Sequence, residues 1–257
     1  MRQFIQSVIA GLTRNLKIMV NILNYPTLTS TNDTAKTFPN PTHGTVIMTD
    51  IQTAGRGRYG RKFFSPPDCG IYMSVILLPQ QIQEHNLITP MAAVAVCKAI
   101  EALTDKRPQI KWVNDVFLNE RKICGILTEA MEDRIVIGIG INFAMPPCGF
   151  PTEIAATAGA LFDQPPLSPT RQQLAKEIAN CILHHCAPRN DVLCEYKKRL
   201  LVLGRRVSVI SVANSDVLYE ATATDIDENG GLIVQKDSGE IVTLTAGEVS
   251  LKLQHSF

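Results

Sequence analysis

Residues 55–62 read Gly55-Arg56-Gly57-Arg58-Tyr59-Gly60-Arg61-Lys62 and place three glycines and four cations within eight positions. Glycine lets the backbone adopt positive φ values and approach a ligand closely. Arginine offers a planar, permanently charged group that matches the oxygens of carboxylates and phosphates. The stretch therefore predicts a mobile loop that closes over an anionic ligand.

Two common nucleotide-binding patterns begin in this loop, and neither is completed. Gly55-x-Gly57-x-x-Gly60 matches the dinucleotide fingerprint, which requires a helix to start on the loop. The next residues include the pair Pro66-Pro67, which a helix does not accommodate. A P-loop is also excluded, because Arg61-Lys62 stands where Gly-Lys-Ser/Thr would begin. These mismatches argue against a Rossmann-type oxidoreductase and against a Walker site.

The positive charge of the loop is local. The chain of 257 residues has 25 basic and 24 acidic residues, and 45% of its residues are hydrophobic. That balance suits a packed protein and disfavours a general polyanion binder. A small anionic ligand is therefore favoured, and a nucleic-acid-binding module remains the alternative from another functional class.

The cysteine pattern indicates a reduced, cytoplasmic protein. There are seven cysteines, an odd number, and no C-x-x-C pair. Cys181-x-x-His184-His185-Cys186 resembles a metal cluster, but it ends a predicted helix and has no second pair of ligands. A half-buried helix face is preferred over a zinc site.

The N-terminal segment has no predicted role. Its apolar residues are interrupted by charges, so it is too short and broken for a signal sequence or a membrane span. Met19 is a candidate start, and no other stretch approaches the length of a membrane span.

Hydrophobic patterning predicts strands and helices up to about Gly204, and only short strands separated by turns after it. The apolar, β-branched runs predict strands at 22–25, 45–50, 71–78, 110–118, 123–130 and 134–143. Helical spacing predicts helices at 87–103, 170–186 and 192–201. Short strands at 207–212, 219–224, 232–234 and 241–244, separated by turn residues, predict a small separate β-barrel.

Three further stretches have polar or glycine residues in unexpected places. Residues 29–33 (Thr-Ser-Thr-Asn-Asp) suit a helix N-cap, and the same groups could bind a neutral polar ligand head. Residues 110–118 carry Lys, Asn and Asp beside the only Trp, which suits either a site or a half-exposed strand. Glycines 125, 138 and 140 interrupt adjacent strands and suggest a floor cleared for a flat ligand.

Taken in order, these motifs resemble those of the biotin protein ligases, over about Ile22 to Leu253. The family's Gly-Arg-Gly-Arg-x-Gly-Arg loop is present at 55–61, and Gln52 precedes it. Its Lys-Trp-Pro-Asn-Asp motif is matched at 111–115, with Val113 in place of proline. The Ser-Thr-Asn cluster stands at 30–32, and residues 122–127 and 138–142 match the later signatures.

The resemblance implies an α+β fold. A mixed sheet packed with helices would form a catalytic domain at 22–201, after an N-terminal extension at 1–21, and a small Src-homology-3-type β-barrel would occupy 204–257. The family's repressor-type members carry an N-terminal winged-helix DNA-binding domain. The residues before Ile22 are too few for such a domain, so a short form that does not bind DNA is expected.

The resemblance also implies the activity: biotin and ATP give biotinyl-5′-AMP, and a lysine of a biotin carboxyl carrier protein, a subunit of acetyl-CoA carboxylase, then takes the biotin. Lys111 and Arg58 would be catalytic. The biotin site would comprise Ser30, Thr31, Asn32, Gln52, Gly55, Arg56, Gly57, Arg58, Lys111 and Gly125. The nucleotide site would comprise Arg56, Arg58, Arg61, Phe63, Lys111, Asn114, Asp115, Lys122 and Asn142.

Mg²⁺ would accompany ATP near Asp115. A homodimer is compatible with the family, and no membrane association is expected. The nearest alternatives within the fold are lipoate ligases and octanoyl transferases, whose arginine-glycine signature differs from the loop at 55–61.

Overall fold

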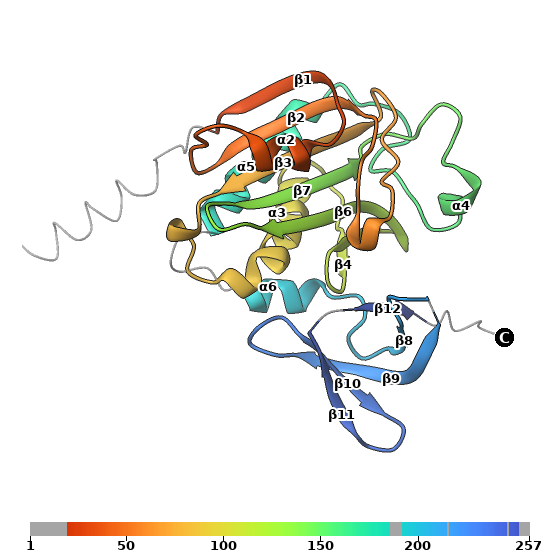
Figure 1. The fold of residues 1–257 in the computed structure, drawn as a ribbon. Helices are drawn as coiled ribbons and strands as arrows, with labels where there is room; N and C mark the ends of the chain where they lie inside the picture. Colours follow the sequence, from red (N-terminus) through yellow and green to blue (C-terminus); the bar gives the residue numbers. More distant parts are fainter. Residues whose placement is uncertain (1–19, 186–191, 215, 246, 252–257) are drawn as a thin grey trace, which may run out of the picture.

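The computed structural model describes residues 20–185, 192–214, 216–245 and 247–251, which form two sheets (Figure 1). The larger sheet has seven strands in the order β1-β2-β3-β7-β6-β5-β4. These are β1 (Ile22–Leu28), β2 (Thr45–Gln52), β3 (Gly70–Leu77), β4 (Gln109–Lys111), β5 (Asp115–Leu118), β6 (Arg121–Ala130) and β7 (Ile135–Asn142). Strands β1 and β2 are parallel and the other neighbours are antiparallel, so the predicted mixed sheet is confirmed.

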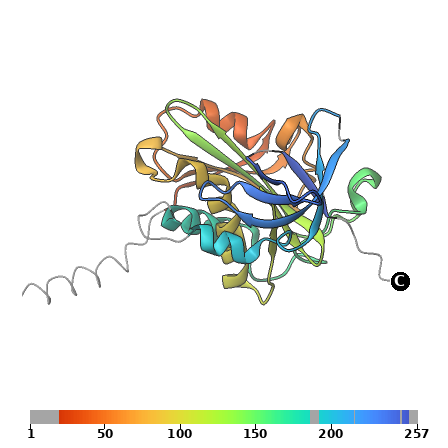
Figure 2. The same ribbon diagram turned by 90° about the horizontal axis from the view of Figure 1, so that it is seen from below.

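Helices cover the two faces of this sheet unequally. The helices are α2 (Thr31–Thr37), α3 (Ile88–Leu103), α4 (Thr152–Ala155), α5 (Arg171–His185) and α6 (Val192–Arg199), with short 3-10 turns η2 (Arg58–Gly60), η3 (Pro79–Gln81) and η4 (His85–Leu87). Figure 2 shows α2 on one side of the strands and α3, α5 and α6 on the other. The short helix α2 covers only part of its face, so the rest is left for loops and a ligand.

Strand alternation divides the core between these faces. In β3 and β7, Ile76 and Val136 pack with Ala35 of α2, while their neighbours Val75 and Ile137 join the larger core. The side chains that point to the α2 side thus lead directly from a small apolar cluster to the candidate site.

The second sheet is antiparallel, with the order β11-β10-β9-β8-β12. Its strands are β8 (Arg206–Ile210), β9 (Val217–Ile226), β10 (Leu232–Lys236), β11 (Ile241–Leu244) and β12 (Glu248–Leu251). The first four were expected and β12 was not. The arrangement is consistent with the small barrel predicted from the sequence.

The two sheets share one apolar core. Tyr196 of α6 is fully buried, and its hydroxyl donates to the carbonyl of Val113 at 2.9 Å. Leu201 and Val207 belong to the same buried cluster as α3 and the main sheet. The indole of Trp112 donates to the carbonyl of Gly230 in the β9–β10 turn at 2.9 Å. These contacts seat the small sheet against the main one.

The prediction of a single strand at 110–118 is wrong. The chain instead forms the hairpin β4–β5, in which Ile110 pairs with Val116 and Lys111 with Asp115. The turn contains a cis peptide bond between Trp112 and Val113. Trp112 is buried toward the second sheet, a tertiary contact that alternation in the sequence does not reveal.

One expectation about membranes also needs correction. The segment His85–Leu103, which includes α3, is long and apolar enough to pass a length-and-composition test for a membrane span. Most of it is buried inside the protein, as expected for a core helix. It packs on α5, α6 and the strands β4, β5 and β6.

The Cys181–Cys186 motif can be followed only in part. Cys181 lies on α5, near the Glu177 carboxylate at 3.8 Å, and Cys186 lies outside the described residues. Among the residues that the structure describes, no group of three His, Cys, Asp or Glu side chains could hold a metal ion. The segment before Val20 and the candidate start at Met19 likewise lie outside them.

Candidate active site

The N-terminus of α2 forms the first part of the candidate site. Ser30 is the N-cap, and its hydroxyl accepts from the backbone N–H of Asp33 at 3.4 Å. The Gln52 side-chain oxygen lies 2.9 Å from the Thr31 N–H and 3.2 Å from the Thr31 hydroxyl. Gln52 then donates to the Ser65 hydroxyl at 3.2 Å. The cap expected for this stretch is confirmed, and Gln52 joins the stretch to Ser65, which follows the arginine loop.

Asn32 lies on α2, and its side chain reaches the sheet. Its side-chain oxygen accepts from the Ser74 hydroxyl at 2.6 Å, and its Nδ2 lies 2.7 Å from Glu129 Oε2 and 3.3 Å from the Leu127 carbonyl. A Cβ at Gly138 would meet Asn32 Oδ1 at 2.1 Å. Asn32 therefore needs the glycine beneath it, and its oxygen retains room for one further donor.

The arginine-glycine loop forms a hairpin. The N–H of Phe63 donates to the carbonyl of Gly55 at 2.9 Å, and the N–H of Gly57 donates to that of Arg61 at 2.7 Å. At the tip, Tyr59 has φ 58° and is half exposed. The hairpin directs its arginines toward different elements of the fold.

Arg58 reaches across to both sheets. One terminal nitrogen donates to Asn114 Oδ1 at 3.0 Å, and the other donates to the carbonyl of Gly247 at 3.1 Å. The guanidinium also stacks on the Tyr59 ring, 4.7 Å from its centroid. Arg58, expected from the sequence to be catalytic, thus connects the loop, the 111–115 turn and the segment before β12.

The glycine floor is present, but protein side chains cover it. Gly125 and Gly140 are cross-strand partners, and the Phe63 ring lies over both. A Cβ at Gly140 would meet this ring at 2.6 Å, and one at Gly125 would meet it at 3.4 Å. Tyr72 packs edge-on against Phe63, with 6.4 Å between ring centroids. A ligand that lies on these glycines therefore requires Phe63 to move.

The β4–β5 hairpin and the start of β6 bring charged groups to the same side. Lys122 Nζ lies 2.7 Å from Asp115 Oδ2 and would be 3.5 Å from a Cβ at Gly125. Lys111 faces Asp115 across the hairpin, with its Nζ 5.8 Å from the centroid of the Phe117 ring. Two lysines and one carboxylate thus flank the glycine strip.

Asn114 and Asn142 are both tied to the backbone. Asn114 Nδ2 donates to the carbonyl of Ile126 at 2.8 Å, and Asn142 Nδ2 donates to that of Gly159 at 2.8 Å. The side chain of Arg61 is exposed in the arginine hairpin. Each asparagine therefore holds a loop in place at the rim of the site.

A cavity of about 230 Å³ opens beside Arg58, between the two sheets. Its walls include Asn114 and Leu127 from the main sheet and Asn229 and Thr245 from the small one. It is smaller than the roughly 300–1,000 Å³ typical of small-molecule sites.

Sequence reasoning missed four side chains of this region. Ser74 is the only serine or threonine in the apolar strand β3, and that feature could have identified it. Asp33, Lys36 and Glu129 join the site through contacts between α2 and the end of β6. No short motif contains all three, because Glu129 lies 93 residues after Lys36.

Two sequence families match the chain. The Biotin/lipoate A/B protein ligase family matches residues 25–142, and the Biotin protein ligase C terminal domain matches residues 202–252. The biotin–acetyl-CoA-carboxylase ligase of Mycobacterium tuberculosis is 30% identical, over 80% of this chain and 78% of that protein. The bifunctional ligase/repressor BirA of Bacillus subtilis is 41% identical, over 55% of this chain and 46% of that protein.

Thus the chain spans about half the length of the first curated relatives that it matches. Among solved structures, the biotin protein ligase of Aquifex aeolicus in complex with biotin and ATP superposes with a TM-score of 0.76 and 26% identity. The match covers 91% of this chain and 99% of that one. The similarity extends through both sheets.

Proposed function

The chain belongs to the biotin protein ligase family, and from this premise we propose that it activates biotin with ATP and transfers the biotinyl group to a carrier-protein lysine. One observation carries the proposal. The arginine hairpin bridges α2 and the 111–115 turn, through Arg56 to Asp33 and Arg58 to Asn114. Its Phe63 lies over the glycines between them. This arrangement supports a site that holds a polar head group at one end and phosphates at the other.

The first step must bring two anions together. A carboxylate oxygen of biotin attacks the α-phosphorus of ATP, a P–O bond breaks, and pyrophosphate leaves with its electron pair. Cations must offset the repulsion between the carboxylate and the phosphate and the charge that grows on the phosphoryl oxygens. Arg58, Lys111 and Lys122 are the cations proposed for this work, with Arg56 and Arg61 as further phosphate contacts.

The head-group end is polar and uncharged at its centre. The hydroxyls of Ser30 and Thr31, with the amides of Asn32 and Gln52, suit the ureido ring of biotin. Gly55 and Gly57 let the hairpin backbone approach it, and Gly125 leaves room for the apolar bicycle. The buried position of residues 30–32 supports this role, because hydrogen bonds there are protected from water.

The residues also fit a magnesium ion bound chiefly to ATP. Asp115 has one oxygen paired with Lys122, and its other oxygen is buried without a hydrogen-bond partner among the described residues. Mg²⁺ commonly binds one or two carboxylates together with substrate phosphates and water. Asp115 would hold the ion, which would neutralise part of the triphosphate charge. Asn114 and Asn142 complete the proposed nucleotide site.

In the second step, the lysine amine of the carrier attacks the acyl carbon, and AMP leaves. The mixed anhydride is already activated, so the protein's task is to exclude water and to present the intermediate. Phe63 and the hairpin must move aside for ligands, and they can close again over the adenylate. The proposal includes stacking of Phe63 on the nucleotide.

The alternative substrate within the fold is lipoate or octanoate. The family that matches residues 25–142 is named for both biotin and lipoate ligases. The family that matches residues 202–252 is named for biotin protein ligases alone. The second sheet contacts Arg58 and Trp112 directly, which supports biotin over lipoate.

We propose a biotin carboxyl carrier protein of acetyl-CoA carboxylase as the acceptor, in the cytoplasm. Light scattering after gel filtration tests whether the protein forms a homodimer.

The test is transfer to a carrier. The protein is incubated with ATP, Mg²⁺ and biotin, lipoate or octanoate, together with a biotin carboxyl carrier domain or its Lys→Arg variant. We expect a mass increase of one biotinyl group on the native carrier only, and only with biotin and ATP. Transfer of lipoate or octanoate instead, or none with any acid, would contradict the proposal.

A further inference from the structure

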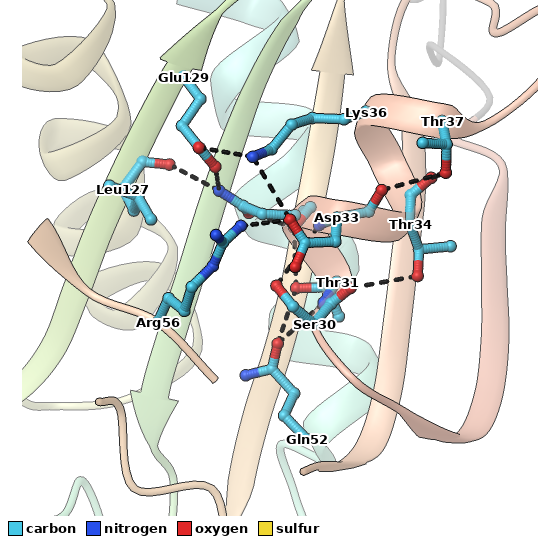
Figure 3. Close-up of polar contacts among 12 residues, drawn as sticks. Ser30, Thr31, Asp33, Thr34, Lys36, Thr37, Gln52, Arg56, Leu127 and Glu129 are labelled. Atoms are coloured by element: carbon cyan, nitrogen blue, oxygen red, sulfur yellow. Dashed lines mark hydrogen bonds and ion pairs between the residues drawn. The ribbon is translucent and has the colours of Figure 1, made fainter. Parts of the chain in front are cut away.

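A line of alternating charges connects the arginine hairpin to the sheet (Figure 3). Arg56 pairs with Asp33 on α2, and Lys36 lies 3.4 Å from Asp33 and 2.6 Å from Glu129 on β6. Glu129 in turn accepts from Asn32 Nδ2 at 2.7 Å. The first arginine of the hairpin is thus linked to Asn32 of the head-group cluster by three side chains from two elements.

The outer pair of this line is exposed and the inner pair is shielded. The side chains of Asp33 and Arg56 are 47% and 40% exposed, while those of Lys36 and Glu129 are 23% and 28% exposed. Burial would raise the pKa of Glu129, but hydrogen bonds from Lys36 and Asn32 and the charges of Lys36 and Arg56 lower it below its usual value. The Glu129 carboxylate is therefore favoured in its charged form beside Lys36, and Lys36 contacts Asp33.

The contact between Arg56 and Asp33 leaves part of the guanidinium for a ligand. Asp33 Oδ1 meets the arginine through Nη2. A guanidinium has five N–H donors in a fixed fork, so it can bind a carboxylate on one side and a second anion on another. The hairpin backbone also pairs at this point, where Arg56 bridges to Lys62.

We propose that Asp33 is a positioning residue that holds Arg56 toward the site, with Lys36 and Glu129 as its support. This inference rests on the proposed function and adds to it a residue outside the family motifs. Asp33 does not touch the reacting atoms. It keeps the hairpin near α2, so that the Arg56 side chain is already held in position to contact the adenylate. Loss of Asp33 should release the hairpin and shorten the lifetime of the bound intermediate.

The first test measures the hairpin itself and needs no substrate. Arg56, Arg58, Arg61 and Lys62 are trypsin sites, and Asp33→Asn leaves all of them intact. Cleavage tracks the population of the open hairpin when opening is fast. We expect loop cleavage, mapped by mass spectrometry, to become about twofold to fivefold faster, which corresponds to about 0.4–1 kcal/mol. Asp33→Glu should restore most of the protection.

Glu240→Gln is the matched control. Glu240 forms a partly exposed pair with Lys236 at 2.9 Å in the small sheet, so its loss removes a comparable contact elsewhere. This variant should leave loop cleavage unchanged. If Asp33→Asn accelerates cleavage equally at sites outside the loop, the effect is general destabilisation, and the proposal is wrong.

The second test measures release of biotinyl-AMP and separates this inference from the proposed function. Asp33→Asn should speed release about twofold to fivefold while the KM for biotin stays within about twofold. In an Arg56→Gln background it should have no further effect. Unchanged release, or slower release because Asp33 competes with the ligand for Arg56, would overturn the proposal. If the unmodified protein forms no adenylate, the proposed function fails, while the cleavage experiment still decides whether Asp33 holds the hairpin.

Discussion

Gly138→Ala should damage the head-group cluster without adding or removing a polar group. The new Cβ would lie 2.1 Å from Asn32 Oδ1 and 2.9 Å from its Nδ2. Asn32 is only 4% exposed, so it must leave its bonds to Ser74 and Glu129 to relieve the overlap. A neutral hydrogen bond contributes about 0.5–1.5 kcal/mol and one to a charged group about 1.5–3 kcal/mol. We therefore expect a loss of about 2–4 kcal/mol of unfolding free energy.

The assays are urea denaturation followed by circular dichroism, and calorimetric titration with biotin. We expect biotin affinity to fall at least about tenfold, since about 1.4 kcal/mol corresponds to a factor of ten. Gly125→Ala is the control, because its Cβ would meet Lys122 and Phe63 at 3.4 Å, a tight but tolerable contact. The unfolding free energy of Gly125→Ala should lie within about 1 kcal/mol of that of the native protein. Equal stability of the two variants, with unchanged biotin affinity for Gly138→Ala, would refute the reasoning.

Three further variants test other parts of the site. Arg58→Gly should still form adenylate but release it about tenfold to a hundredfold faster, because charge-assisted hydrogen bonds are lost. The released adenylate should then biotinylate added albumin, and labelling confined to the carrier would contradict faster release. Trp112→Phe removes the donor to the carbonyl of Gly230 and should lower the unfolding free energy by about 1–3 kcal/mol in urea titrations, whereas a change below about 0.5 kcal/mol would argue against an interdomain anchor. Folding lowers the pKa of Glu129, so this carboxylate contributes stability above about pH 4.3, and the contribution is lost as pH falls through the folded pKa. Glu129→Gln should therefore make the melting temperature depend less on pH between about pH 5 and 3. An unaltered pH profile would exclude this contribution.

Local signals in the sequence predicted the main elements well. The long apolar helix was expected at 87–103 and is observed as Ile88–Leu103, because burial, helical spacing and length all agree there. The strands that became β6 and β7 were placed within about two residues, since their apolar runs end at turn residues. The Ser30 cap followed from residue type alone.

Features that depend on distant contacts were not predicted. The hairpin at 109–118 was read as one strand, because nothing local shows that Trp112 is buried against Gly230. The glycine floor was inferred from missing side chains, but Asn32 and Phe63 fill part of that space from other segments. Asp33 was read as part of a cap or of a polar ligand site, and its pairing with Arg56 was not foreseen, since Arg56 comes from the hairpin.

The most direct test of the central claim is biotin-dependent exchange of labelled pyrophosphate into ATP, measured for the native protein and for Lys111→Ala. Exchange requires only that adenylate forms reversibly at this site. Lys111 is a half-buried polar residue at the end of β4 and not part of the apolar core, so its loss should leave the circular dichroism spectrum and melting temperature nearly unchanged. We predict rapid exchange by the native protein that depends on biotin, and no measurable exchange by the variant. Exchange without biotin, or exchange by Lys111→Ala within a few fold of the native rate, would contradict the account.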